Sequence, residues 1–134
     1  MGKCWKVIFD LKPVPVAVGD TPLCTDVQTR IIAGGTEYCS VYLTPLRAIL
    51  QKDENGMQAS HQLRIGEWNR IVITHEEGEG GNFFVSLSVG EEELMKMDVG
   101  ILEQEKFLDV QLLLGSPGHH SSVFTRRILV IEKS

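Results

Sequence analysis

The sequence has no hydrophobic stretch long enough to cross a lipid bilayer. A membrane-spanning helix needs about 20 consecutive apolar residues, and charged or turn-forming residues interrupt every apolar run of this 134-residue chain much sooner. The first residues also lack the uninterrupted apolar segment of a secretory signal peptide, because Lys6, Asp10 and Lys12 fall among them. The sequence therefore predicts no membrane span, and it indicates either an intracellular protein or a mature or excised piece with an added methionine.

The chain has fewer positively charged than negatively charged residues. Thirteen Lys and Arg residues stand against 18 Asp and Glu residues, which gives a formal net charge of -5. Proteins that bind duplex nucleic acid normally present a dense basic surface to the phosphates. The local pair Arg126-Arg127 does not change that balance, so the composition excludes nucleic acid as the partner.

Cysteine is scarce and shows no metal-binding spacing. The chain has three cysteines, Cys4, Cys24 and Cys39, and none of them forms a Cys-x-x-Cys motif. Zinc-ribbon and thioredoxin-like sites are therefore excluded. Two alternatives stay open: three reduced thiols, or one disulfide, most plausibly between Cys4 and Cys24, with a free thiol left over.

What the chain does contain is a series of short apolar segments separated by clusters of Gly, Pro, Asn and Asp. This pattern is typical of an all-β domain with antiparallel strands. Internal repeats and long linkers are missing, so we expect a single β-sandwich domain over residues 1–134. The expected strands span residues 5–11, 14–18, 27–33, 37–43, 68–74, 83–89, 94–99, 108–114 and 124–131.

The clearest pattern lies between Gly66 and Gly90. Apolar residues alternate with polar ones in the second half of this segment, as expected of a strand with one buried face. The expected inward-facing residues are Ile71, Ile73, Phe83, Val85, Leu87 and Val89. Trp68 is also predicted to lie in the core, whereas the sequence does not place Trp5. Tyr38 and Tyr42 are expected to share one face of their strand.

The segment 44–56 supports two interpretations. Thr44-Pro45 resembles the start of a helix, and Leu46, Ile49 and Leu50 have helical spacing. The alternative is a hairpin with strands at 47–52 and 57–65 around an Asn55-Gly56 turn. We favour the hairpin because it agrees with the strands on both sides.

Several of these segments together resemble a laminin G or concanavalin-like module. The resemblance rests on Gly66-Glu67-Trp68 with the strand that follows, on residues 83–90, on Leu112-Leu113-Leu114-Gly115 and on the closing strand 124–131. It implies an antiparallel jelly-roll β-sandwich. The chain shows no acidic calcium ligands in the corresponding loops, so no metal and no cofactor are expected.

A second resemblance, to farnesoic acid O-methyltransferase-like domains, covers more of the chain. It rests on residues 31–35, 40–50, 68–74 and 113–116. The family name does not imply methyl transfer here, because the chain lacks a glycine-rich turn between strand and helix for a nucleotide. The resemblance implies a small β-domain that acts as an interaction module.

Each candidate for chemistry has a simpler interpretation. His119-His120 could ligate a metal, but a site needs three or four ligands, and His61 and His75 lie far away in sequence. The glutamates at 76, 77, 79 and 91–93 occupy expected hairpin tips, where solvated charges are normal. A nucleophile at Cys39 or Ser40, with a histidine and Asp98, lacks the framing motif of a hydrolase.

We therefore predict a non-catalytic module that binds a protein or a glycan through the loops of the sandwich. The expected ligand-binding residues are Glu37 and Tyr38 in the loop 34–38, and His119 and His120 in the loop 115–122. A carbohydrate-active hydrolase on the same fold and a structural or homo-oligomerising domain are the alternatives. An extracellular or secreted location is expected, with the cytoplasm as the alternative.

Overall fold

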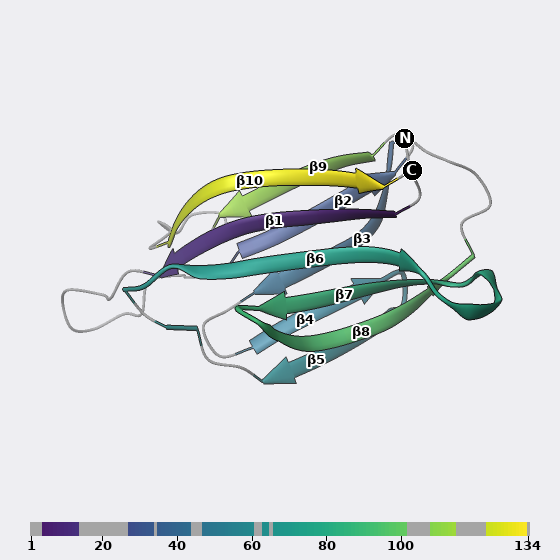
Figure 1. Cartoon of the computed structure of the whole chain (residues 1–134), viewed down its shortest axis with the longest axis horizontal. Helices are drawn as coiled ribbons and strands as arrows, with labels where there is room; N and C mark the ends of the chain where they lie inside the picture. The colour runs from purple at the N-terminus through teal and green to yellow at the C-terminus, as the bar shows by residue number, and fades with distance from the viewer. Residues whose placement is uncertain are drawn as a thin grey trace.

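Two antiparallel sheets of five strands each are stacked face to face (Figure 1). The computed structural model describes residues 4–13, 27–33, 35–43, 47–60, 63–64, 66–101, 108–114 and 123–133. The strands are β1 (Cys4–Pro13), β2 (Val27–Ala33), β3 (Thr36–Leu43), β4 (Arg47–Lys52), β5 (Asn55–Ser60), β6 (Asn69–Glu77), β7 (Phe83–Val89), β8 (Glu92–Gly100), β9 (Leu108–Leu114) and β10 (Val123–Lys133), with a 3₁₀ turn, η1, at Glu79–Gly81. The predicted antiparallel β-sandwich is confirmed.

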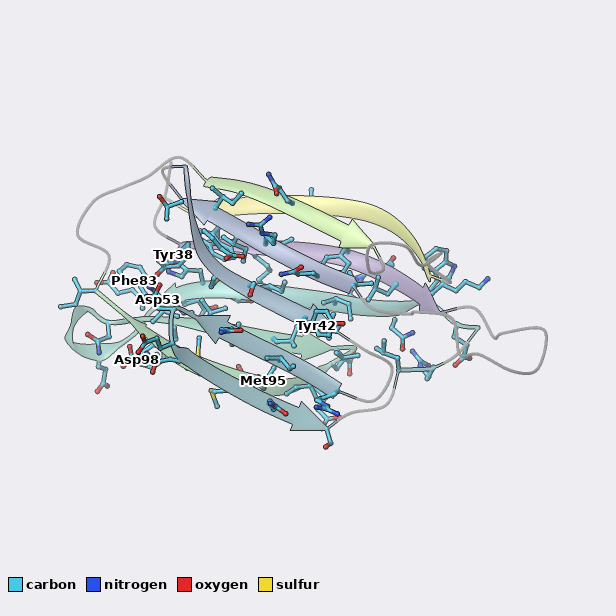
Figure 2. The ribbon with its side chains drawn as sticks, turned by 180° about the vertical axis from the view of Figure 1, so that it is seen from behind. Tyr38, Tyr42, Asp53, Phe83, Met95 and Asp98 are labelled. Carbon is cyan, nitrogen blue, oxygen red and sulfur yellow. The ribbon has the colours of Figure 1, made fainter. Side chains whose placement is uncertain are left out.

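Strands that follow one another in sequence mostly pair within one sheet, as β2 to β5 and β6 to β8 do. The first sheet has the order β10-β1-β6-β7-β8, and the second sheet has the order β5-β4-β3-β2-β9. In Figure 1 the first sheet lies in front, and Figure 2 shows the second sheet from behind. None of the helices in the part of the chain that the structure describes is long and apolar enough to span a membrane.

The core lies between the sheets and is built by alternation along the strands. In β1 to β4 and β6 to β8, alternate residues point inward and are mostly shielded from solvent. The first sheet contributes Val7, Phe9, Leu11, Ile71, Ile73, Val85 and Leu87, and the second contributes Val27, Ile31, Val41, Leu43, Ala48 and Leu50, each 0–1% exposed. The inward face predicted for Ile71, Ile73, Phe83, Val85, Leu87 and Val89 is confirmed, with Val89 half-buried opposite Ile71 and packed against this core.

The hairpin predicted at 47–65 is present, but its turn lies two residues earlier than expected. Lys52 pairs with Asn55, so the turn residues are Asp53 and Glu54. This register places Leu50 opposite Met57. Asp53 adopts the left-handed backbone conformation in this turn, with φ of +53°. Its carboxylate lies 3.2 Å from Lys52 Nζ.

Of the two tryptophans, it is Trp5, which the sequence does not place, and not Trp68 that lies in the core. Trp5 is 5% exposed and belongs to the core. Trp68 precedes β6 and is only half-buried, with Lys12 Nζ 5.7 Å from the centre of its ring. The prediction that Trp68 lies in the core is wrong, because the chain reaches the inward-facing alternation of β6 only at Asn69.

Asn69 joins the segment before β6 to β1. Its side chain is 3% exposed, and its Nδ2 donates to the carbonyl oxygens of Arg64 at 3.0 Å, Glu67 at 3.1 Å and Leu11 at 3.3 Å. Its Oδ1 accepts from the Arg64 N–H at 3.0 Å. A single amide therefore satisfies polar backbone groups on both sides of the bend.

The strand predicted at 14–18 lies outside the described residues, as does Cys24. Cys4 and Cys39 are free thiols in the structure, so the proposed disulfide from Cys4 is not formed. The single-domain assignment over 1–134 stays a prediction.

Replacing Gly78 with alanine should destabilise the protein by about 1–3 kcal/mol. Gly78 lies in the turn between β6 and β7, and a methyl carbon there would overlap the Cε2 and Cδ2 atoms of Phe84. Chemical denaturation followed by circular dichroism measures the loss. Gly56→Ala is the matched control, since its nearest contact would be an ordinary 3.7 Å, and it should be neutral or stabilising. Equal losses for the two variants would contradict this account of the turn.

Candidate functional site

The outer face of the second sheet presents one aromatic ring near its middle. Tyr42 lies between the buried Val41 and Leu43 on β3, so the alternation of the strand turns its side chain away from the core (Figure 2). Across the sheet, Tyr42 pairs with Gln28 of β2 on one side and with Ile49 of β4 on the other. Ile49 in turn pairs with Gln58 of β5.

Polar side chains surround this ring on the same face. Arg30 pairs with Ser40, and Ser40 pairs with Gln51. These three residues form a second row across the sheet, beside the row of Gln28, Tyr42, Ile49 and Gln58. Arg47, at the start of β4, is exposed. We call this surface the Tyr42 face and define it by Gln28, Arg30, Ser40, Tyr42, Arg47, Ile49, Gln51 and Gln58.

The Tyr42 face offers hydrogen bonding more than charge. Its amides and hydroxyls both donate and accept hydrogen bonds, and its guanidinium groups only donate. Arg30 Nε lies 3.2 Å from Glu37 Oε1, so Glu37 offsets one of the positive charges at the rim. Such a surface can hold a neutral ligand that has an apolar face for the tyrosine ring and hydroxyl groups around it.

Glu37 and Tyr38 belong to β3 and not to a loop, contrary to the prediction. Ala33 pairs with Thr36, which makes the connection between β2 and β3 very short. Gly35 permits this tight turn because its φ is +82°. His119 and His120, the other two predicted ligand-binding residues, lie outside the described residues.

A β-bulge separates Tyr38 from Tyr42. The register changes between Ile31, which pairs with Cys39, and Ile32, which pairs with Glu37, so Tyr38 is the extra residue. A bulge turns successive side chains toward the same side of a sheet. Tyr38 therefore packs against the core, and the prediction that both tyrosines share one face is wrong.

Tyr38 reaches a stack of three rings inside the sandwich. The ring of His75 lies 4.9 Å from that of Trp5 and 4.8 Å from that of Phe83, with interplanar angles of 7° and 8°. Tyr38 Oη lies 3.0 Å from His75 Nε2, and the Tyr38 ring meets the imidazole edge-on. His75 is only 1% exposed, so this cluster is part of the packing.

Burial holds the ionisable groups beside this stack in their protonated forms. It raises the pKa of the Tyr38 hydroxyl to about 12, and the neighbouring Cys39 contributes a smaller part. Burial also raises the pKa of the Cys39 thiol to about 12. A thiol of that pKa is a poor nucleophile, and Ser40 and His75 lie on opposite sides of the second sheet. The structure therefore contradicts a nucleophile at Cys39 or Ser40 with His75.

The outer face of the first sheet is the competing surface. A pocket of about 300 Å³ opens there, and both signs of charge line it, including Lys6, Lys96, Glu76 and Glu93. Within the described ranges, no cluster of three or more His, Cys, Asp or Glu side chains is arranged to hold a metal ion. Glu79 and Glu91 lie in hairpin turns, as predicted, whereas Glu76 and Glu77 belong to β6 and Glu92 and Glu93 to β8.

Solved structures share this architecture. Sheep galectin-11, determined in complex with glycerol, superposes with a TM-score of 0.63 at 10% sequence identity, over 98% of this chain and 92% of that chain. An endo-β-1,4-glucuronan lyase from the fungus Trichoderma reesei superposes with a TM-score of 0.56 at 8% identity, over 98% of this chain and 69% of that chain.

The fold is a concanavalin-like β-sandwich. No family model and no curated protein sequence matches the chain. The concanavalin-like half of the predicted resemblance is thus confirmed at the level of the fold, while the laminin G and farnesoic acid O-methyltransferase-like resemblances stay predictions.

The sequence did not predict that the residues of the Tyr42 face lie together on one surface. The alternation of Val41, Tyr42 and Leu43 does indicate that the ring of Tyr42 points outward.

Proposed function

We propose that the chain is a non-catalytic glycan-binding module and that the Tyr42 face is its binding surface. The observation that carries the proposal is the half-buried ring of Tyr42 between Gln28 and Ile49, with Arg30, Ser40 and Arg47 nearby. A sugar has an apolar face that packs on an aromatic ring and hydroxyl groups that need hydrogen-bonding partners. The likeness of the fold to a galectin, a lectin by name, supports the proposal.

A protein partner is the weaker alternative for this surface. Protein-binding surfaces usually expose a contiguous apolar patch of several hundred square ångströms. Among the residues whose side-chain exposure the structure describes, the exposed large hydrophobic ones are Met57, Ile101 and Leu129. They lie on β5, after β8 and on β10, so they do not form one patch.

We also propose that the module catalyses nothing. A catalytic acid or base usually has a pKa shifted toward the working pH inside a cleft. Burial instead moves the pKa values of Tyr38 and Cys39 away from neutrality. A glycan-binding role also agrees with the expected extracellular location, which remains a proposal.

Tyr42→Ala should weaken glycan binding by about 30-fold or more, the loss expected when a central aromatic contact is truncated. A glycan array probed with the wild-type protein identifies the ligand, and isothermal titration with that ligand measures the variant. Tyr42→Phe keeps the ring and should retain most of the affinity.

Phe84→Ala is the matched control, because Phe84 is a half-buried aromatic residue on the outer face of the first sheet. It should leave glycan binding unchanged. If no glycan on the array binds, or if Tyr42→Ala binds as well as wild type while folding normally, the proposal is wrong.

A further inference from the structure

Strand β5 forms one edge of the second sheet. Among the described strands it is hydrogen-bonded only to β4 (Figure 1). Its residues are exposed except for Ala59, which is half-buried. An edge strand of this kind carries a row of backbone N–H and C=O groups available to another strand.

The sequence of β5 contains none of the features that normally block such an edge. Asn55-Gly56-Met57-Gln58-Ala59-Ser60 has no charged residue and no proline. The contrast is β8, the terminal strand of the first sheet on the same side of the sandwich, which carries Glu92, Glu93, Lys96 and Asp98. Charges along an edge prevent pairing with other chains, so β8 is protected and β5 is not.

The hairpin geometry determines which backbone groups of β5 face outward. The two-residue turn closes with the pair Lys52 and Asn55, and a turn of this length makes its closing pair a hydrogen-bonded one. The backbone groups of alternate residues of β5, namely Asn55, Met57 and Ala59, then form hydrogen bonds with β4. The N–H and C=O groups of Gly56, Gln58 and Ser60 point away from the sheet.

We propose that a second copy of this chain pairs its own β5 with this edge, antiparallel and about a two-fold axis at Gln58. In this register Gly56 exchanges hydrogen bonds with the partner subunit's Ser60, and Gln58 with the partner subunit's Gln58. Every outward backbone group of Gly56, Gln58 and Ser60 finds a partner, and no like charges meet.

The same register covers an exposed apolar side chain. Met57 is 40% exposed and lies on the inward side of β5, opposite Leu50. Across the two-fold axis it would face the partner subunit's Ala59, in the non-hydrogen-bonded position where side chains approach most closely. A strand of self-complementary sequence and neutral charge favours a second copy over an unrelated peptide as the occupant.

Sedimentation equilibrium over a range of concentrations tests this pairing, and its readout does not depend on glycan binding. The wild-type protein should approach twice the mass of the chain. Gln58→Pro removes an outward N–H in each copy and should raise the dimer dissociation constant about tenfold or more. Gln58→Lys places two like charges directly opposite each other and should raise it about fivefold.

A mixture of Gln58→Lys and Gln58→Glu chains should regain the dimer, because opposite charges then meet on the axis. Gln51→Lys adds the same charge to the same face on β4, away from the edge, and should dimerise as wild type does. A wild-type protein that keeps the mass of one chain throughout would overturn the proposal. A dimer that Gln58→Lys and Gln58→Pro leave unchanged would also overturn it, provided that circular dichroism finds both variants folded.

Discussion

Replacing Trp5 with alanine is expected to lower the free energy of unfolding by about 3–5 kcal/mol. The indole is 5% exposed and stacks on His75, which in turn stacks on Phe83. Its removal would leave one face of a buried, polar imidazole without a packing partner. It would also enlarge a pocket of about 360 Å³ that already reaches Trp5 and His75 from the surface, so water could reach the ring stack.

Urea denaturation followed by far-ultraviolet circular dichroism measures this cost. If the alanine variant does not fold, Trp5→Phe keeps a ring in the stack and should cost only about 1–2 kcal/mol. Trp68→Ala is the matched control, since it deletes the same side chain from a half-buried site, and it should cost no more than about 1–2 kcal/mol. A larger loss for Trp68 than for Trp5 would contradict the assignment of the core.

Asn69→Ala is expected to cost about 2–4 kcal/mol, a large effect for a single uncharged polar side chain. Its amide bonds the carbonyl oxygens of Leu11, Arg64 and Glu67 and the N–H of Arg64. Alanine would leave these backbone groups without that partner in a site that is 3% exposed at Asn69. Buried polar groups that lose their partners cost more than the net value of the hydrogen bonds.

Asn69→Asp separates hydrogen bonding from simple loss of volume. A carboxylate of the same shape can accept from the Arg64 N–H, but it would face three carbonyl oxygens without a proton to donate. It should destabilise the protein more than alanine does at neutral pH. Asn82→Ala, which removes one exposed hydrogen bond to Asp98 at 2.9 Å, should cost less than about 1 kcal/mol. If the aspartate variant is as stable as wild type, the hydrogen bonds to Asn69 do not hold this bend.

The sequence pattern was sufficient for most of the scaffold. The strands expected at 27–33, 83–89 and 108–114 have those bounds in the structure, because apolar alternation and flanking glycines are local signals. The hairpin at β4 and β5 was also preferred correctly over a helix. In each case the side chains that alternate in the sequence are those that must be buried on one face of a sheet.

The site was less predictable, because it depends on contacts between distant strands. The bulge at Tyr38 changes the direction of one side chain, and only the pairing of Ile31 with Cys39 reveals it. The turn at Asp53 and Glu54 overrode a strong Asn-Gly signal, and its register places Met57 opposite Leu50 and Ala59 opposite Ala48. Glu37 and Tyr38 were expected both at the start of the strand 37–43 and in the binding loop 34–38, and β3 contains both because it begins at Thr36.

The alternation along β2, β3 and β4 also bears on how the protein can evolve. Gln28, Tyr42 and Ile49 each lie beside residues that are buried in the core, yet their own side chains are on the other side of the sheet. Substitutions at these outward positions can therefore alter the proposed binding surface while the packing of the sandwich stays the same. Selection can act on that surface and on stability almost separately, so the chemistry of this face can change over long periods without a change of fold.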